Sequence, residues 1–338
     1  MLPEKGAGIC CDRIGITGAI MKIDLITGFL GAGKTTFIRL YAQYLMKRGE
    51  SICILENDYG AVNVDMMFLQ DLLGDQCELE MVIGGDGYEA HRRRFKTKLI
   101  SMAMTGYDRV LVEPSGVFDV DEFFDTLREE PLDRWYTPGN VISIVSAVPE
   151  NDLSDDSRYL LASQTANAGC VILSKVQNAS ESDIINTISL LNDVIEEYKC
   201  SRRFGDDVIV MDWSKFDSDD LERIGNCGFR QEDHIKYQVE QENGYKSLFY
   251  FYVDMGEQEF RNTAEAIFHD SACGDIKRIK GFVKTESGKW IQINAVPGKI
   301  EFSERERGQE ALIVIGENLN RKAIDKYFKN RVRYHGEL

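Results

Sequence analysis

The chain has 338 residues and carries 56 acidic against 40 basic side chains, which gives a net charge of −16. This length fits two domains of unequal size. The acidic surface disfavours a nucleic acid partner, because its phosphate groups would be repelled. No run of about 18 apolar residues occurs, so we predict no membrane-spanning helix. The eight cysteines show no repeated spacing, which is typical of reduced thiols in a cytoplasmic protein.

Residues 1–20 lack the apolar core of a signal peptide, and we interpret them as an extension of uncertain status. The first clear strand follows Met21 directly, which leaves Met1 and Met21 as alternative starts. From there to about residue 225 short apolar strands alternate with amphipathic helices. The expected strands are 22–27, 51–56, 109–113, 140–147, 170–174 and 207–211, and the clearest helices are 34–47 and 181–199. This order predicts an α/β domain over 21–225 with a mostly parallel sheet.

The pattern changes beyond residue 225. Residues 226–245 are polar and non-periodic, and we interpret them as a linker. Strands are expected over 247–254, 276–285, 289–295 and 312–316, with helices over 258–271 and 321–329. We therefore predict a smaller α+β domain with an antiparallel sheet over 246–331.

A phosphate-binding loop is expected between the first strand and the first long helix. The segment Gly28-Phe29-Leu30-Gly31-Ala32-Gly33-Lys34-Thr35 has the Gly-x-x-x-x-Gly-Lys-Thr pattern of a P-loop NTPase. Its backbone N–H groups and the helix N-terminus attract phosphate oxygens. Lys34 is placed for the β- and γ-phosphates and the Thr35 hydroxyl for Mg²⁺. The predicted nucleotide contacts in this loop are Gly28, Gly31, Ala32, Gly33, Lys34, Thr35 and Thr36, the last toward the α-phosphate.

A carboxylate at the end of a second apolar strand is the expected acidic partner of this loop. Here the strand runs into Glu113-Pro114-Ser115-Gly116. Glu113 is placed to hold Mg²⁺ through a water or to orient the attacking water, and the Gly116 N–H to meet the γ-phosphate. Phosphoryl transfer requires chiefly positioning and charge neutralisation, so these few groups suffice.

Together these motifs resemble the CobW-type P-loop GTPases, a family linked to metal delivery. Asn57-Asp58-Tyr59-Gly60 followed by Asp65 is similar to that family's switch segment, and Arg278-Ile279-Lys280-Gly281 with the Trp290 strand is similar to its C-terminal module. The resemblance implies a GTP/GDP-binding, Mg²⁺-dependent domain with Lys34, Asp58 and Glu113 as catalytic groups. It also implies a second domain that binds a partner or substrate, with a metal or a metalloenzyme as cargo.

The family's metal motif, Cys-x-Cys-Cys, is absent from its expected place at Ile83-Gly84-Gly85-Asp86-Gly87-Tyr88. Thiolates are the ligands that bind Zn²⁺ tightly, so the usual metal site is missing. Two readings remain for the polar residues nearby. They form a weaker site, or they are surface carboxylates with a stray thiol; the residues concerned are Cys77, Glu78, Glu80, Asp86 and His91.

The motif that reads guanine in relatives, Asn-Lys-x-Asp, is Ser174-Lys175-Val176-Gln177 here. The Lys175 stem can still pack along the base. Gln177 offers one carbonyl oxygen and an unwanted N–H donor where an Asp would accept two hydrogen bonds. The loss is worth about 1.5–3 kcal/mol, or roughly a ten- to hundredfold lower preference for guanine, so adenine remains possible. A similar string, Ser214-Lys215-Phe216-Asp217, follows the wrong strand, and we interpret it as a helix start.

These observations lead to a GTPase that hydrolyses GTP to GDP and phosphate and couples the reaction to a partner or cargo. The alternative is a nucleotide-binding regulator with little hydrolysis and relaxed specificity for ATP or GTP. A small-molecule kinase on the same loop is a third, weaker hypothesis.

Overall fold

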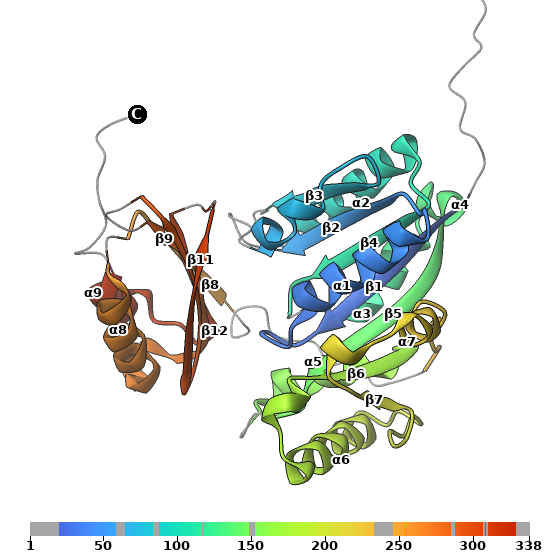
Figure 1. Ribbon diagram of the computed structural model, residues 1–338. Helices are drawn as coiled ribbons and strands as arrows, with labels where there is room; N and C mark the ends of the chain where they lie inside the picture. Colours follow the sequence, from blue (N-terminus) through green and yellow to red (C-terminus); the bar gives the residue numbers. More distant parts are fainter. Residues whose placement is uncertain are drawn as a thin grey trace, which may run out of the picture.

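The computed structural model describes residues 20–58, 65–83, 88–116, 118–148, 153–232, 246–253, 255–284, 288–306, 308 and 310–328. Two sheets follow one another along the chain and stand side by side (Figure 1). No helix in these ranges is long and apolar enough to cross a membrane.

The first sheet has seven strands in the order β3-β2-β4-β1-β5-β6-β7, and every pair of neighbours is parallel. Its strands are β1 (Met21–Gly28), β2 (Ile52–Asp58), β3 (Cys77–Ile83), β4 (Arg109–Pro114), β5 (Tyr136–Ser146), β6 (Cys170–Ser174) and β7 (Val208–Val210). This sheet confirms the predicted α/β class, with β3 as an additional strand at one edge.

Helices cover both faces of this sheet because its strands are apolar on both sides. One face packs against α1 (Lys34–Lys47) and α7 (Ser218–Ile224). The other packs against α2 (Tyr88–Thr105), α3 (Val120–Leu127), α5 (Asp155–Ala166) and α6 (Glu181–Glu197), with the short α4 (Leu132–Trp135) at its margin. Phe37, Tyr41 and Leu45 form the buried stripe of α1, at the helical spacing that the sequence predicts.

The second sheet has five antiparallel strands in the order β11-β10-β9-β12-β8. They are β8 (Lys246–Phe251), β9 (Asp275–Lys284), β10 (Trp290–Val296), β11 (Lys299–Arg305) and β12 (Ala311–Glu317). Two helices, α8 (Glu257–His269) and α9 (Arg321–Phe328), cover its outer face (Figure 1). The α+β prediction with an antiparallel sheet is therefore confirmed.

The inner face of the second sheet is turned toward the first domain (Figure 1). Successive side chains of a strand point to opposite faces. On β9, Ile279 and Val283 pack under α8 and α9, so Arg278, Lys280 and Phe282 belong to the inner face. This alternation supplies the inner face with charged side chains.

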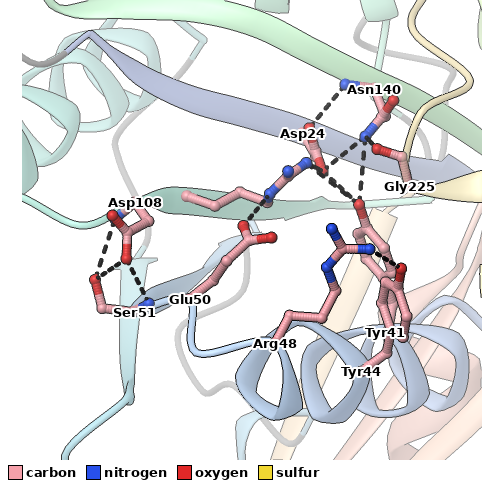
Figure 2. A network of polar contacts seen from close by, with 10 residues as sticks. Asp24, Tyr41, Tyr44, Arg48, Glu50, Ser51, Asp108, Asn140 and Gly225 are labelled. Atoms are coloured by element: carbon pink, nitrogen blue, oxygen red, sulfur yellow. Dashed lines mark hydrogen bonds and ion pairs between the residues drawn. The ribbon is translucent and has the colours of Figure 1, made fainter. Parts of the chain in front are cut away.

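A buried polar network ties β1 to its neighbours (Figure 2). The Asp24 carboxylate accepts hydrogen bonds from Arg109 Nη1 at 2.7 Å, Tyr41 OH at 2.9 Å and the Asn140 backbone N–H at 2.7 Å. Glu50 accepts from Arg109 Nε at 2.9 Å. Burial and then the charge of Asp24 raise the pKa of Tyr41, which therefore remains a donor. One carboxylate thus joins α1, β4 and β5 to the central strand.

Residues 226–232, the described beginning of the predicted linker, pack on the first domain. The Gly228 carbonyl accepts a hydrogen bond from the Val141 N–H at 2.9 Å, and the Phe229 ring lies 5.2 Å from that of Phe124. Residues 233–245 lie outside the described ranges. The proposed domain boundaries at 225 and 246 remain predictions.

Candidate functional site

The loop after β1 curls because its glycines adopt conformations that other residues avoid. Gly33 has φ +103° and begins α1, and Gly28 has φ +143°. A Cβ at Gly28 would lie 2.2 Å from the Ile144 carbonyl oxygen, so only glycine fits beside β5. A Cβ at Gly33 would meet the Trp213 ring at 3.1 Å. These conformations let the loop curl at the start of α1, the backbone shape on which a phosphate site depends.

Lys34 and Thr35 lie at the beginning of α1, where the predicted roles require them. Lys34 is buried, and its Nζ donates a hydrogen bond to the Gly28 carbonyl at 2.9 Å. The lysine side chain therefore reaches back from the start of α1 to the first residue of the loop. The Thr35 hydroxyl donates to Glu113 Oε1 at 2.8 Å. Glu113 belongs to β4, which pairs with β1, so the sheet itself brings the loop and the carboxylate together.

The paired oxygens of Thr35 and Glu113 fit a Mg²⁺ ion. A hydroxyl and a carboxylate are the hard oxygen ligands that Mg²⁺ prefers, usually alongside water and phosphate oxygens. Both oxygens are within hydrogen-bond distance of each other at the phosphate loop. These two residues would hold the ion, and when bound it would neutralise charge on the phosphates.

Gly116 lies against the phosphate loop. A Cβ there would be 2.7 Å from the Leu30 backbone nitrogen, which leaves no room for a side chain. Its carbonyl accepts a hydrogen bond from Gln164 Nε2 of α5 at 2.9 Å, and Gln164 is fully buried. Gly116 is thus held close to the place predicted for the γ-phosphate, and it is linked to α5.

The predicted base-reading segment lies on the wall of the same cavity. Lys175 has φ +59° and begins a short 3₁₀ helix, η3 (Val176–Asn178), which contains Gln177. A second short helix, η4 (Trp213–Lys215), faces it, and Asp212 caps this helix through the Ser214 N–H at 3.0 Å. Lys175, Gln177, Asp212 and Trp213 all line the cavity. Asp217, by contrast, caps α7 through the N–H groups of Asp219 and Asp220, as expected of a helix start.

The cavity has a volume of about 1260 Å³ and is bounded by both domains. Its second wall comes from the inner face of the second sheet, including Arg278, Lys280, Asn294, Glu301 and Arg305. A hydrogen bond from Lys299, with a smaller contribution from the charge of Lys175, lowers the pKa of Glu301. The second domain therefore comes close to the base-reading segment as well as to the phosphate loop. The sequence motifs gave no sign of this second wall.

The structure brings most of the predicted nucleotide contacts to this one cavity. Its lining includes Gly31, Ala32, Gly33, Lys34, Thr35, Thr36, Glu113, Gly116, Lys175 and Gln177. Gly28 stands at the base of the loop through its bond to Lys34. Asp58 ends β2 and Asp65, the last residue of the predicted switch, begins a short 3₁₀ helix, while residues 59–64 between them lie outside the described residues. Two cavity residues that the motifs did not indicate, Glu56 and Trp213, become visible only in the fold.

The polar residues near the missing cysteine motif have separate partners. His91 Nε2 lies 2.7 Å from Asn57 Oδ1, Glu80 pairs with Lys98 at 2.8 Å, and Tyr107 OH donates to Glu78. Asp86 lies outside the described residues. Within the part of the chain that the structure describes, no three His, Cys, Asp or Glu residues are grouped so as to hold a metal ion.

The parallel sheet, the glycine loop at the start of α1 and the Thr35–Glu113 pair define the class: a P-loop nucleotide-binding fold. The family described as CobW/HypB/UreG, nucleotide-binding domain, matches residues 22–202, and the Cobalamin synthesis protein cobW C-terminal domain matches residues 249–332. The first match alone covers more than half of the chain, so the chain belongs to this family. The resemblance inferred from the motifs is thereby confirmed.

Two curated relatives come from Escherichia coli strain K12. The zinc chaperone YjiA is 27% identical over 172 residues, which are 48% of this chain and 52% of the relative. The zinc chaperone YeiR is 27% identical over 155 residues, 46% of each chain. This chain therefore spans about half the length of the curated relatives it matches.

Two solved structures match the chain at low sequence identity. The hydrogenase maturation factor HypB from Archaeoglobus fulgidus is 16% identical, with 61% of this chain and 91% of that chain covered and a TM-score of 0.39. The Zn(II)-bound YjiA GTPase from Escherichia coli is 19% identical, with 93% and 100% covered and a TM-score of 0.36.

Proposed function

We propose that this protein binds GTP with Mg²⁺ and hydrolyses it to GDP and phosphate, coupling turnover to a protein partner or to a metal-related cargo. The observation that carries the proposal is the 2.8 Å contact between the Thr35 hydroxyl and Glu113 beside the buried Lys34. These are the groups that position and neutralise a triphosphate in P-loop enzymes.

Each group has a distinct part in this reaction. Lys34 exchanges its bond to the Gly28 carbonyl for the β- and γ-phosphate oxygens. Glu113 orients the attacking water or holds Mg²⁺ through water, and the Gly116 N–H meets the γ-phosphate. Asp58, at the end of β2, begins the predicted switch segment, which we expect the γ-phosphate to order.

The coupling part of the proposal rests on the two-walled cavity. A nucleotide in it would touch both domains, so hydrolysis would change what holds them together. Two bacterial relatives, YjiA and YeiR, are named as zinc chaperones, which supports a metal or a metalloenzyme as cargo. The absent cysteine motif and the separate partners of His91 and Glu80 favour a cargo carried without the usual thiolate site.

The deciding experiment measures equilibrium binding of GTP, GDP, ATP and ADP to the purified protein with Mg²⁺, followed by phosphate release. We expect Lys34→Ala to abolish binding and hydrolysis, because it removes the charge that crosses the loop. Lys47→Ala, an exposed lysine at the other end of α1, is the matched control and should behave as the wild type. Turnover retained by Lys34→Ala would refute the assignment.

A second function is favoured by one observation, the glutamine at position 177 on the cavity wall. A regulator that binds ATP or GTP with little hydrolysis would show similar affinities for both bases and no phosphate release. A clear preference for GTP together with turnover would exclude it. Tight stoichiometric uptake of Zn²⁺ or Co²⁺ would contradict the inference that the thiolate site is missing.

A further inference from the structure

The second wall of the cavity is basic although the protein is acidic. Four cationic side chains of the second domain line the cavity, against two carboxylates, Glu301 and Glu306; the cations are Arg278, Lys280, Lys299 and Arg305. They lie opposite the phosphate loop, in a chain with a net charge of −16. Positive charge concentrated at one place on an acidic protein indicates an anion there.

Direct contacts hold this wall against the phosphate loop and the end of the switch. Leu30 of the loop and Phe68 of η1 (Asp65–Phe68) pack in one apolar cluster with Phe282 and Ile315 of the second sheet. The Phe68 and Phe282 rings are 5.9 Å apart. Since Leu30 lies within the phosphate loop itself, the inner face borders the space where the triphosphate would bind.

Three of the four cations already have defined partners. Lys299 pairs with Glu301 at 2.7 Å. Arg305 donates through Nε to Gln292 at 2.9 Å, and its guanidinium stacks over the Phe68 ring. Lys280 is buried and also engaged in the fold.

Arg278 differs from these three. Its Nε donates to Asn294 Oδ1 at 2.9 Å, a bond that fixes the plane of the guanidinium. Within the described ranges, its two terminal nitrogens make no other hydrogen bond or ion pair. On the sheet Arg278 is the register neighbour of Ile315, which belongs to the same apolar cluster as Leu30. An oriented guanidinium with unused donors among the described residues thus lines the cavity, and its register neighbour packs in the same apolar cluster as Leu30 of the phosphate loop.

We propose that Arg278 binds the γ-phosphate oxygens of the nucleotide across the domain boundary and stabilises their charge during hydrolysis. In that reaction the water oxygen bonds to the γ-phosphorus as the bond to the β–γ bridging oxygen breaks, giving GDP, inorganic phosphate and a proton. A fork of N–H donors suits the negative charge that gathers on these oxygens. The second domain is then part of the active site, and Asn294 is a positioning residue. This inference rests on the proposed function.

The test compares the wild type with Arg278→Ala, using the full chain. Arg321→Ala is the matched control. Arg321 is an exposed arginine at the start of α9, and this helix lies on the side of the second sheet that faces away from the first domain (Figure 1). We measure kcat for GTP hydrolysis, the affinity for GDP, and the affinity for GDP with aluminium fluoride, which mimics the transferring phosphoryl group. Arg278→Gln keeps most of the side chain's length and takes the place of the alanine variant if that variant does not fold.

We expect Arg278→Ala to lower kcat and the affinity for the fluoride complex at least about tenfold, while its GDP affinity stays within about twofold of the wild type. Asn294→Ala should lower kcat less, and Arg321→Ala should change nothing. This inference alone is defeated if the wild type turns over GTP and Arg278→Ala has the same kcat. It is also defeated if Arg278→Ala loses affinity for GDP and for the fluoride complex equally. A wild-type chain that binds no nucleotide, or binds without turnover, defeats the proposed function and this inference together.

Discussion

The choice of base depends on single side chains around η3. Lys175 is held by the left-handed turn that begins this helix, and Gln177 follows two residues later on the cavity wall. An amide at this place gives guanine one acceptor and an opposed donor, whereas a carboxylate gives two acceptors. The chemistry of Gln177 therefore suits guanine less well than a carboxylate at this position would.

We predict that Gln177→Asp raises the ratio of the GTP affinity to the ATP affinity by about ten- to hundredfold. Both affinities are measured by titration in the presence of Mg²⁺. The new carboxylate would accept two hydrogen bonds from the N–H groups of the guanine edge. Asn226→Asp, at an exposed position outside the cavity lining, is the control and should leave the ratio unchanged. An unaltered ratio in Gln177→Asp would mean that another group, such as Asp212, reads the base.

At this scale the phosphate residues could be predicted because their motif is contiguous and its chemistry depends on the backbone. Lys34, Thr35 and Glu113 meet as their order along two parallel strands implies. Arg278 and Trp213 could not be assigned in this way. Each reaches the cavity only through the packing of elements that are remote in the sequence, and the pattern of one strand does not encode that packing.

Among the elements, β1 is the one on which the site depends, and its buried Asp24 fixes its neighbours (Figure 2). Burial lowers the pKa of Arg109, but the charge of Asp24, the neighbouring Tyr41 and the hydrogen bonds to Asp24 and Glu50 together outweigh burial and raise the pKa. Removing Asp24 would leave the Arg109 guanidinium buried, with Glu50 as its one ionic partner among the described residues.

We predict that Asp24→Ala lowers the free energy of unfolding, measured in urea, by about 3–5 kcal/mol. Asp108→Ala is the control, because Asp108 is exposed where it accepts hydrogen bonds from Ser51, and its loss should cost less than about 1 kcal/mol. Equal losses in the two variants would show that the network does not anchor β1.

The strands absent from the sequence prediction, β3 and β11, are both edge strands. β11 reads Lys-Ile-Glu-Phe-Ser-Glu-Arg, and β3 carries Glu78 and Glu80. Edge strands tolerate charge because one side faces solvent, and charge there discourages pairing with other chains. Apolar runs therefore miss the two charged edge strands, whereas the other two edges, β7 and β8, are apolar enough to be predicted.

For the whole molecule, the contact between the domains depends on polar as well as apolar groups. Glu317 of β12 is buried, and it accepts hydrogen bonds from the hydroxyls of Ser154 at 2.8 Å and Ser157 at 3.0 Å, at the N-terminus of α5. A carboxylate is favourable at a helix N-terminus. This bond joins the second sheet to the helix that also holds Gly116 through Gln164.

We predict that Glu317→Ala loosens the two domains, seen as a larger radius of gyration in small-angle X-ray scattering and as two separate steps in thermal unfolding. Glu304→Ala is the control, because its ion pair with Lys289 is exposed and lies within the second sheet. A compact Glu317→Ala protein with a single unfolding step would show that the apolar cluster around Phe68 suffices to hold the domains together.

The shared cavity has a thermodynamic consequence for any partner of the second domain. Suppose that a ligand binds the second domain more tightly when the inner face of that domain packs on Leu30 and Phe68. If the nucleotide favours the same packing, this ligand must alter the affinity of the protein for the nucleotide. By linkage the nucleotide alters the affinity for the ligand by the same factor. Cargo binding and nucleotide binding would then be coupled through one equilibrium between the two domains. Titrating the cargo in the presence of nucleotide, or the nucleotide in the presence of cargo, would measure the same coupling constant.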